Sequence, residues 1–355
     1  MNPHRTIWSW DAVRAIGILT LAAAALGCFA PAARAATQAY HVVARWVIGG
    51  EGGWDYLTAD PDARRLYITH GTQVEVLDLD QGTKLGAIPG TVGAHGVVVA
   101  PALGKGFIAS GRDSAIVVFD LKSLAVTSRI RVPARFPDAL LYEPVTKRVF
   151  SFNGGSSSAC AFDAATGAFV DSLPLGGKPE FAVADGKGSV YVNIESTSEV
   201  VAFDAKSLKV ARRSPLAPGE EPTGLAMDGE RQLLFSGCSN QHMAVVDAKT
   251  GKLAGTLPIG QGVDAVAFDA KRRTAFASCG DGTLTVAREK KPGEFAVAET
   301  DSTQRGARTM ALDEKTGRVF VVTASFGPPP DPTPDNPHPR PTIQPGTFVV
   351  LVLDR

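Results

Sequence analysis

The chain has 355 residues, of which 44% are hydrophobic and 20% are charged, with 36 acidic residues and 36 lysines and arginines. This composition excludes a disordered chain and an integral membrane protein, and it lacks the positive charge typical of polyanion-binding proteins. The 37 glycines and 24 prolines indicate many turns. Two average domains would fit this length, but a repeat architecture can fill it as one unit.

The N-terminus has the features of a secretory signal peptide. Arg5 and Arg14 supply positive charge around the start of an apolar run at residues 15–30, and a small-x-small cleavage pattern ends at Ala35. We therefore expect residues 1–35 to be removed and the protein to be periplasmic or secreted. Two alternatives are a lipoprotein anchored through Cys28, whose preceding residues fit that signal poorly, and an uncleaved anchor.

A pattern that recurs along the rest of the chain determines the expected fold. Five segments end in an aspartate that precedes a turn, namely Asp78, Asp120, Asp163, Asp204 and Asp247. Their spacings are 42, 43, 41 and 43 residues, which is typical of a four-stranded β-propeller blade. Because an aspartate before a tight turn accepts hydrogen bonds from nearby backbone N–H groups, we interpret these residues as turn caps.

Each repeat contains four short segments with the pattern of β-strands. In the first repeat these are WDYLTAD (54–60), RLYITH (65–70), VEVLDLD (74–80) and KLGAIP (84–89). Their alternating apolar residues are bounded by turn-forming residues, as in strands that are joined by short loops. No segment after residue 35 has a long 3.6-residue period, so we expect almost no helix.

The last two repeats depart from this pattern. Arg288 stands where the sixth repeat should have its aspartate, and residues 326–346 form a proline-rich insertion in the seventh. The third strand of the seventh repeat, TFVVLVLD (347–354), ends one residue before the C-terminus, so a fourth strand is missing there. Residues 41–48, HVVARWVI, resemble that missing strand. We therefore predict that residues 36–355 form one all-β domain, a seven-bladed propeller that the N-terminal strand closes in the last blade.

The repeats resemble the YVTN-type β-propeller family, and within it the exported propellers called YncE-like. The segments that carry the resemblance are LYITHG (66–71), PEFAVAD (179–185), VYVNIE (190–195), EEPTGLAMD (220–228) and DAKTGK (247–252). The resemblance covers residues 36–355 and implies the propeller fold. Similar propellers serve as binding proteins, surface proteins, lactonases, lyases and electron-transfer subunits, and the YncE-like group is also associated with single-stranded DNA.

Equivalent positions in the repeats predict one group of side chains at the mouth of the central channel. The first strand of each blade lines that channel, so residues at the starts of these strands should meet. Alignment of the repeats gives Asp55, His95, Asp138, Glu180, Thr223, Asp264 and Arg308. Six of the seven are ionisable, which is unusual at the start of an apolar strand. We expect a ligand to bind here, with Trp54 and Phe181 beside the ring.

The charges of this ring allow two interpretations. Carboxylates that face one axis repel each other, so protons, the cationic side chains or a bound cation must offset their charge. In the structural interpretation these groups bind loop backbones and ordered water. In the functional interpretation they hold a ligand, with or without Ca²⁺, Mg²⁺, Mn²⁺ or Zn²⁺. The candidate metal ligands are Asp55, His95, Asp138, Glu180 and Asp264.

Three further features accompany the ring. Arg305 and Arg308 can clamp a carboxylate or a phosphate, or pair with the ring acids. The insertion at 326–346 springs from the same face and is a lid, a partner-docking segment or a plain surface loop. Cys238 and Cys279 occupy equivalent strand ends in adjacent blades, and we expect two buried thiols rather than a disulfide.

Three functions remain in competition, and the catalytic residues of any enzyme stay open. The sequence has no HExxH motif, nucleophile elbow or Walker loop, so an enzyme would rest on geometry alone. We favour a monomeric binding protein for a small molecule, a glycan or a protein partner. The first alternative is a metal-assisted lactonase, other hydrolase or lyase that uses the acidic ring. Single-stranded nucleic acid binding is the second, and the neutral charge disfavours it.

Overall fold

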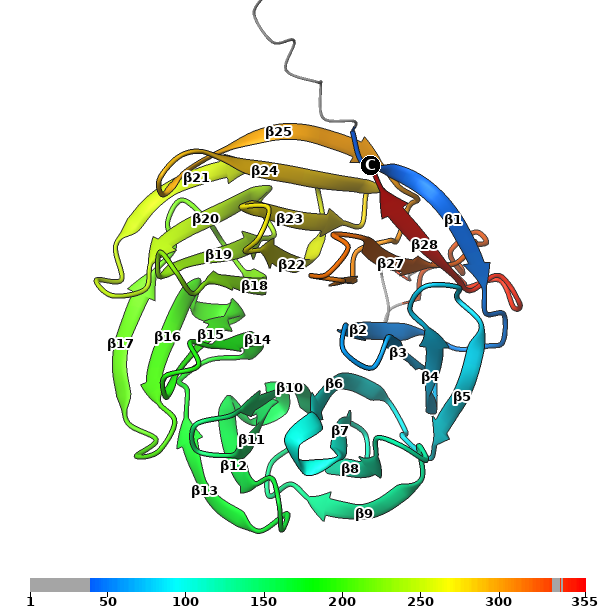
Figure 1. Cartoon of the computed structure of the whole chain (residues 1–355), viewed down its shortest axis with the longest axis horizontal. Helices are drawn as coiled ribbons and strands as arrows, with labels where there is room; N and C mark the ends of the chain where they lie inside the picture. Colours follow the sequence, from blue (N-terminus) through cyan, green and yellow to red (C-terminus); the bar gives the residue numbers. More distant parts are fainter. Residues whose placement is uncertain (1–38, 334–338, 340) are drawn as a thin grey trace, which may run out of the picture. The chain divides into compact units, whose positions relative to one another are not determined.

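The structure is a computed structural model that describes residues 39–333, 339 and 341–355. The expected signal peptide, and with it Cys28 and Ala35, lies outside the described residues. The described residues form seven antiparallel sheets of four strands each, arranged around a common axis (Figure 1). This is the expected all-β, seven-bladed propeller. The only helical segments among the described residues are three short 3-10 turns.

The strands fall into four sets by their place in the blade. The innermost strands are β2 (Trp54–Asp60), β6 (Ala94–Ala100), β10 (Pro137–Glu143), β14 (Pro179–Ala184), β18 (Pro222–Asp228), β22 (Val263–Asp269) and β26 (Met310–Leu312). The second strands are β3 (Arg65–His70), β7 (Lys105–Ser110), β11 (Arg148–Asn153), β15 (Ser189–Ile194), β19 (Leu233–Cys238), β23 (Thr274–Cys279) and β27 (Val319–Thr323).

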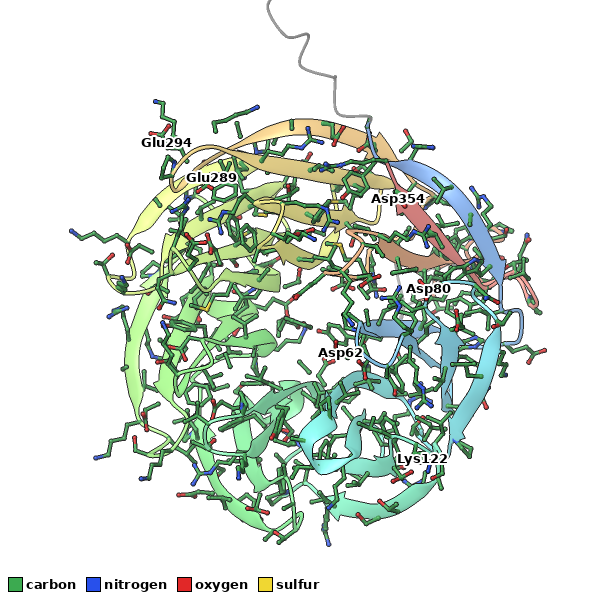
Figure 2. All side chains as sticks on the ribbon, viewed as in Figure 1. Asp62, Asp80, Lys122, Glu289, Glu294 and Asp354 are labelled. Carbon is green, nitrogen blue, oxygen red and sulfur yellow. The ribbon has the colours of Figure 1, made fainter. Side chains whose placement is uncertain are left out.

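The third and fourth sets form the outer half of each blade. The third strands are β4 (Gln73–Asp78), β8 (Ala115–Asp120), β12 (Ser158–Asp163), β16 (Glu199–Asp204), β20 (His242–Asp247), β24 (Thr283–Lys291) and β28 (Val349–Asp354). The outermost strands are β5 (Lys84–Pro89), β9 (Val126–Arg131), β13 (Phe169–Pro174), β17 (Val210–Pro215), β21 (Leu253–Pro258), β25 (Glu294–Ser302) and β1 (His41–Val47). Charged side chains such as Glu294 project from this outer rim (Figure 2).

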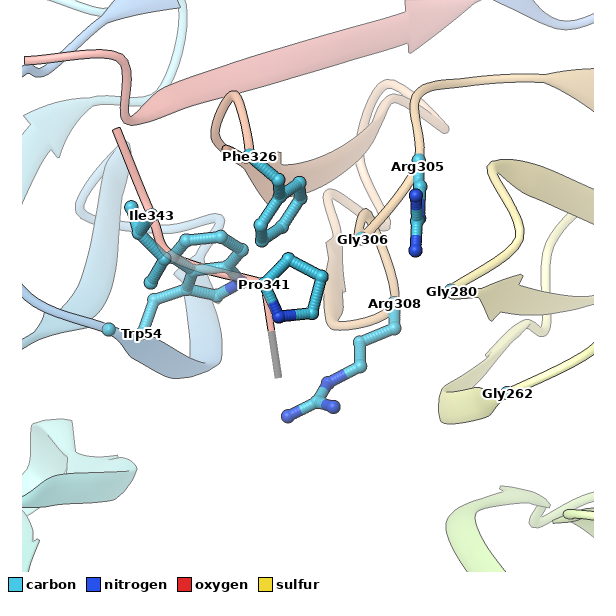
Figure 3. Close-up of a pocket in the computed structure, with 10 residues that line it drawn as sticks. Trp54, Gly262, Gly280, Arg305, Gly306, Arg308, Phe326, Pro341 and Ile343 are labelled. Carbon is cyan, nitrogen blue, oxygen red and sulfur yellow. The ribbon is translucent and has the colours of Figure 1, made fainter. Parts of the chain in front are cut away.

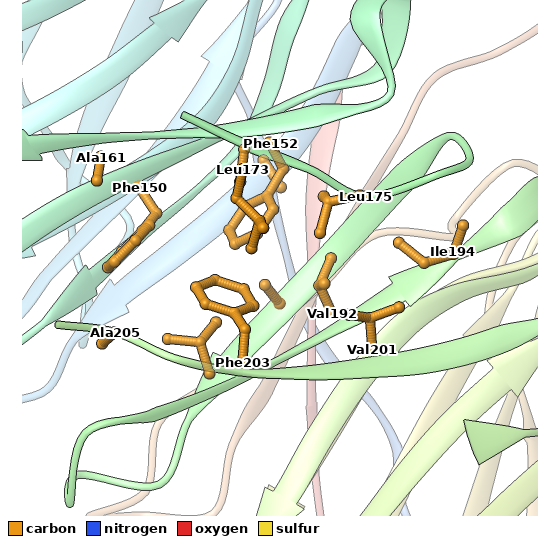
Figure 4. Packing of buried hydrophobic residues seen from close by; sticks show 14 of the residues in the cluster. Phe150, Phe152, Ala161, Leu173, Leu175, Val192, Ile194, Val201, Phe203 and Ala205 are labelled. Carbon is orange, nitrogen blue, oxygen red and sulfur yellow. The ribbon is translucent and has the colours of Figure 1, made fainter. Parts of the chain in front are cut away.

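The apolar core lies between neighbouring blades. Second and third strands are buried on both faces, because each blade packs against the blade before it and the blade after it. Between the third and fourth blades, Phe150 and Phe152 of β11 pack against Val192, Ile194 and Phe203 of the fourth blade (Figure 4). Each such side chain contributes about 1.5–3 kcal/mol when it leaves water. The middle strands therefore read as apolar runs, whereas simple alternation was expected.

The N-terminal strand closes the ring as predicted. β1 pairs antiparallel with β28, and its register places Trp46 opposite Val350. The phenol of Tyr40 donates a hydrogen bond to the carbonyl of Gly317 at 3.0 Å, and Arg64 reaches from the first blade to Asp313 of the last. Because the C-terminal blade takes its fourth strand from the other end of the described chain, the two ends of the ring hold each other.

The repeat aspartates cap turns, as the sequence indicates. Asp120 ends β8, and its carboxylate accepts hydrogen bonds from the backbone N–H groups of Lys122 and Ser123. These hydrogen bonds, together with the hydroxyl of Ser123, lower the pKa of Asp120. Asp163 and Asp204 cap the equivalent turns of the next two blades in the same way.

Candidate functional site

The mouth positions lie at the same place in successive blades. Asp55, His95, Asp138, Glu180, Thr223 and Asp264 are each the second residue of an innermost strand, and Arg308 lies two residues before β26. In the first six blades the pairing of the innermost strand with its neighbour shifts register right after the strand begins. A bulge of this kind turns a side chain out of the regular alternation. Here the bulges bring side chains from different blades into one cavity.

Buried polar side chains on the second strands hold these bulges in place. The hydroxyl of Thr69 donates to the carbonyl of Tyr56 and accepts from the N–H of Asp55. The amide of Asn193 donates to the carbonyls of Thr223 and Gly224 in the next blade. These polar residues fix the backbone from which the mouth side chains project. A polar residue that interrupts an apolar strand is the sequence signal for them.

A cavity of about 310 Å³ occupies the channel mouth. Its charged lining consists of Asp55, Asp138, Lys178, Glu180, Glu195, Asp264 and Arg308. Thr223, Tyr56, Val263 and Gly262 complete the wall. Six of the seven predicted mouth positions therefore line one cavity, and the seventh, His95, contacts two of them. Lys178 was not among the predicted residues, because it precedes its strand and the alignment compared strand positions only.

His95 lies between two ring carboxylates. Its Nδ1 is 2.5 Å from Oδ2 of Asp55 and 3.5 Å from Oδ1 of Asp138. One ligand atom of each of the three residues lies within 4.8 Å of the others, which is compatible with a shared metal ion. Oδ1 of Asp138 is buried and has no hydrogen-bond partner among the described residues. Of the five candidate metal ligands, these three come together.

The other two candidates pair with basic side chains. Glu180 is 2.7 Å from Nζ of Lys178, which also contacts Glu195. Asp264 forms an ion pair with Arg308, with Oδ2 2.8 Å from Nε. The mouth thus contains an acidic cluster around His95 and two ion pairs, Lys178–Glu180 and Arg308–Asp264.

Burial shifts the acid–base equilibria of this ring. Burial raises the pKa of Asp138 well above its usual range, and the charge of Asp55 adds to the rise. Burial and the charge of Asp138 raise the pKa of Glu180, and they outweigh the opposing effect of Lys178. Burial raises the pKa of Asp264 to about 6, although Arg308 acts against it.

The pKa of the His95 imidazole is raised, as are the pKa values of the three ring acids. Burial acts to lower the pKa of His95, but its hydrogen bond to the Asp55 carboxylate and the charge of Asp138 raise it overall. Around neutral pH the ring therefore shares protons among its members, and it can both donate and accept hydrogen bonds.

A second cavity, of about 370 Å³, adjoins the mouth and shares Gly262 and Arg308 with it. Trp54, Phe326, Pro341 and Ile343 form its apolar side, and Arg305 and Arg308 form its basic side (Figure 3). Three of the apolar residues belong to the proline-rich insertion. Residues 334–338 and 340 of that insertion lie outside the described part of the chain.

The two predicted aromatic neighbours lie in different places. Trp54 lines the second cavity and stacks on Phe348, with ring centroids 5.1 Å apart. Phe181 lines the deeper, largely apolar stretch of the channel, of about 440 Å³, where its ring is 5.4 Å from that of Tyr56. Trp54 is therefore positioned to contact a ligand at the entrance, and Phe181 forms part of the floor beneath it.

The cysteines are structural in this fold. Cys160, Cys238 and Cys279 are free and buried. Burial raises the pKa of the Cys238 thiol to about 11 and that of the Cys279 thiol to about 12, so both stay protonated at neutral pH.

Within the described residues no helix is long and apolar enough to cross a membrane.

Comparison with known proteins supports the fold alone. No protein-family model matches the sequence, and no curated protein matches it. The structure is similar to a chain of hydrazine synthase from Kuenenia stuttgartiensis, with a TM-score of 0.66 and 14% sequence identity. The match covers 77% of this chain and 92% of the other. At a sequence identity this low, the similarity supports a shared propeller fold and says nothing about a shared activity.

Proposed function

We propose that this protein is an exported, YVTN-type propeller that binds a small polar ligand in the mouth of its central channel. The observation that carries the proposal is the convergence of ring side chains from different blades on one cavity. A propeller needs no charge at these positions in order to fold, because its core lies between the blades. Buried acids with raised pKa values are a feature of binding and catalytic sites.

The lining of the mouth indicates which ligands fit. Protonated carboxyl groups can donate hydrogen bonds, and ionised carboxylates and the Thr223 hydroxyl, which donates to Val263, can accept them; Lys178 and Arg308 supply positive charge. The deeper channel below is mostly apolar. A hydroxylated small molecule or a single sugar unit matches this combination of size and polarity.

A thermal-shift screen of the full chain against sugars, sugar acids and small organic acids tests the proposal. A ligand at about 100 times its dissociation constant stabilises the folded state by about 2.7 kcal/mol, so a true ligand raises the melting temperature. The triple variant Asp138→Asn, Glu180→Gln and Asp264→Asn should abolish the shift, since it removes three ring acids while it keeps their size.

The matched control makes three acid-to-amide substitutions on the outside of the ring. Asp120→Asn, Asp163→Asn and Asp204→Asn alter three turn caps but leave the mouth intact, so this variant should retain the ligand-induced shift. The proposal fails if no compound shifts the melting temperature, or if the two triple variants respond alike.

A second candidate function rests on the cluster of Asp55, His95 and Asp138. Two carboxylates and one imidazole can hold a divalent cation, and a bound cation would polarise the carbonyl group of a lactone or a related substrate. Titration of chelator-treated protein with Mn²⁺ or Zn²⁺ in a calorimeter tests this function. It predicts one binding event that His95→Gln abolishes and His242→Gln leaves unchanged. An identical isotherm for all three proteins would contradict it.

A further inference from the structure

The cavity beside the mouth combines an apolar wall with two guanidinium groups. Trp54 and Phe326 lie 6.1 Å apart by ring centroid, and Ile343 and Pro341 extend the apolar wall on the insertion (Figure 3). Glycines 53, 262, 280 and 306 line the remaining surface, so backbone rather than side chains borders much of the space. A flat hydrocarbon body can lie against such a wall.

The aromatic wall is built into the fold. The backbone of Phe326 forms a β-bridge with that of Ile343, and the N–H of Gly327 donates to the carbonyl of Thr342 at 2.8 Å. At Gly306 the φ angle is +83°, and an added Cβ atom would lie 2.7 Å from the ring of Phe326. Only glycine therefore leaves the ring of Phe326 where it stands. The bridge and the hydrogen bond therefore hold Phe326 and Ile343 in place where the insertion borders the cavity.

The two arginines differ in their internal partners. Arg308 uses its Nε for Asp264, and among the described residues its terminal nitrogens make no hydrogen bond. Arg305 is exposed, and the described part of the chain offers its guanidinium group neither a hydrogen bond nor an ion pair. Since Asp264 offsets the charge of Arg308, the pair retains about one positive charge for a ligand.

We propose that this cavity binds the carboxylate end of a small aromatic or other flat apolar acid, with the carboxylate at Arg305 and Arg308 and its body against the apolar wall that Trp54, Phe326 and Ile343 form. This inference rests on the proposed ligand-binding function and specifies the ligand class. A carboxylate matches the planar fork of a guanidinium group and carries a single charge, whereas a phosphate monoester carries nearly two. The body contacts the aromatic wall, and any hydroxyl groups face the acid ring next to it.

Calorimetry with three matched probes tests the inference on the full chain. Indole-3-acetate carries the body and the carboxylate, indole-3-acetamide carries the same body without charge, and acetate carries the carboxylate alone. We expect indole-3-acetate to bind one molecule per chain. The amide should bind at least roughly tenfold more weakly, because it loses the charge-assisted contacts to the two arginines, and acetate should give no measurable heat.

Variants of the exposed arginine locate the site. Arg305→Gln should weaken indole-3-acetate binding roughly tenfold without a change in melting temperature, and Arg305→Lys should recover part of the loss. The control Arg131→Gln makes the same charge change on the exposed outer strand β9 and should leave affinity unchanged. Equal affinity for acid and amide, or an Arg305→Gln variant that binds like the parent, overturns the inference.

The same experiments separate failure of this inference from failure of the proposed function. If indole-3-acetate does not bind while a ligand from the screen binds and is lost in the mouth variant, the proposed function stands and the aromatic acid assignment is wrong. If neither binds, both are wrong. Binding of indole-3-acetate that Arg305→Gln weakens supports this inference, and loss of that binding in the mouth variant supports the proposed function as well.

Discussion

Single residues hold the ring closed where β1 meets the first blade. Gly82 has a φ of +71°, and a Cβ atom built there would lie 2.1 Å from the ring of Trp46, which packs on Phe320. Gly104 has a similar φ of +63°, but an added Cβ would meet nothing within 4 Å. The two glycines therefore share the same backbone constraint, and only Gly82 also accommodates a neighbouring side chain.

These two glycines give a matched pair of substitutions. Gly104→Ala should lower the free energy of unfolding by about 1 kcal/mol, because a left-handed backbone is costly for any residue with a Cβ. Gly82→Ala should lower it by about 3 kcal/mol or more, since it also displaces Trp46 from the closing strand. Urea denaturation measures both. Equal losses would show that Trp46 does not depend on Gly82.

Strands of neighbouring blades are also linked by charged networks on the side of the ring away from the mouth. Arg273, just before β23, donates from Nε to Glu289 of β24 at 3.0 Å and from Nη1 to Asp228 of β18 at 3.0 Å. Arg231 donates to the same glutamate at 2.5 Å. The fifth and sixth blades therefore share one network, which ties the end of an innermost strand to a third strand.

This network predicts a pH dependence of stability. The hydrogen bond from Arg273, with help from Arg231, lowers the pKa of Glu289 to about 2, against 4.5 for a free glutamate. A depressed pKa in the folded state adds stability above pH 4.5 that is lost as the pH falls toward 2. Glu289→Gln should lower the urea midpoint at pH 7 but have little effect near pH 2. A difference from the parent that stays constant across this range would contradict the account.

The sequence is more informative about strands than about the positions of side chains within the site. Period and strand pattern predict the seven blades and the role of β1, because each blade repeats the same local chemistry. The same alignment predicts the ring positions, from Asp55 to Arg308, because equivalent residues of a propeller meet at its axis. It does not identify Lys178, which lies outside the aligned strand, or the contribution of Phe326, which depends on how the insertion folds back.

At the scale of the whole molecule, the closed ring makes one site out of residues that are far apart in the chain. Asp55 and Arg308 come from the first and last blades and line the same cavity. Six of the seven blades supply polar side chains to this cavity, and the packing between blades fixes their spacing. The metal role of Asp55, His95 and Asp138 and the ligand role of the remaining ring residues stay predictions, and both depend on this convergence.

The crystal structure of the full chain with a ligand from the screen tests the central claim most directly. We predict difference density for the ligand at the channel mouth, in contact with side chains from at least three blades, among them Glu180 and Arg308. Density confined to the outer strands, or to a contact with a single blade, would show that the convergence of charged residues does not form the binding site.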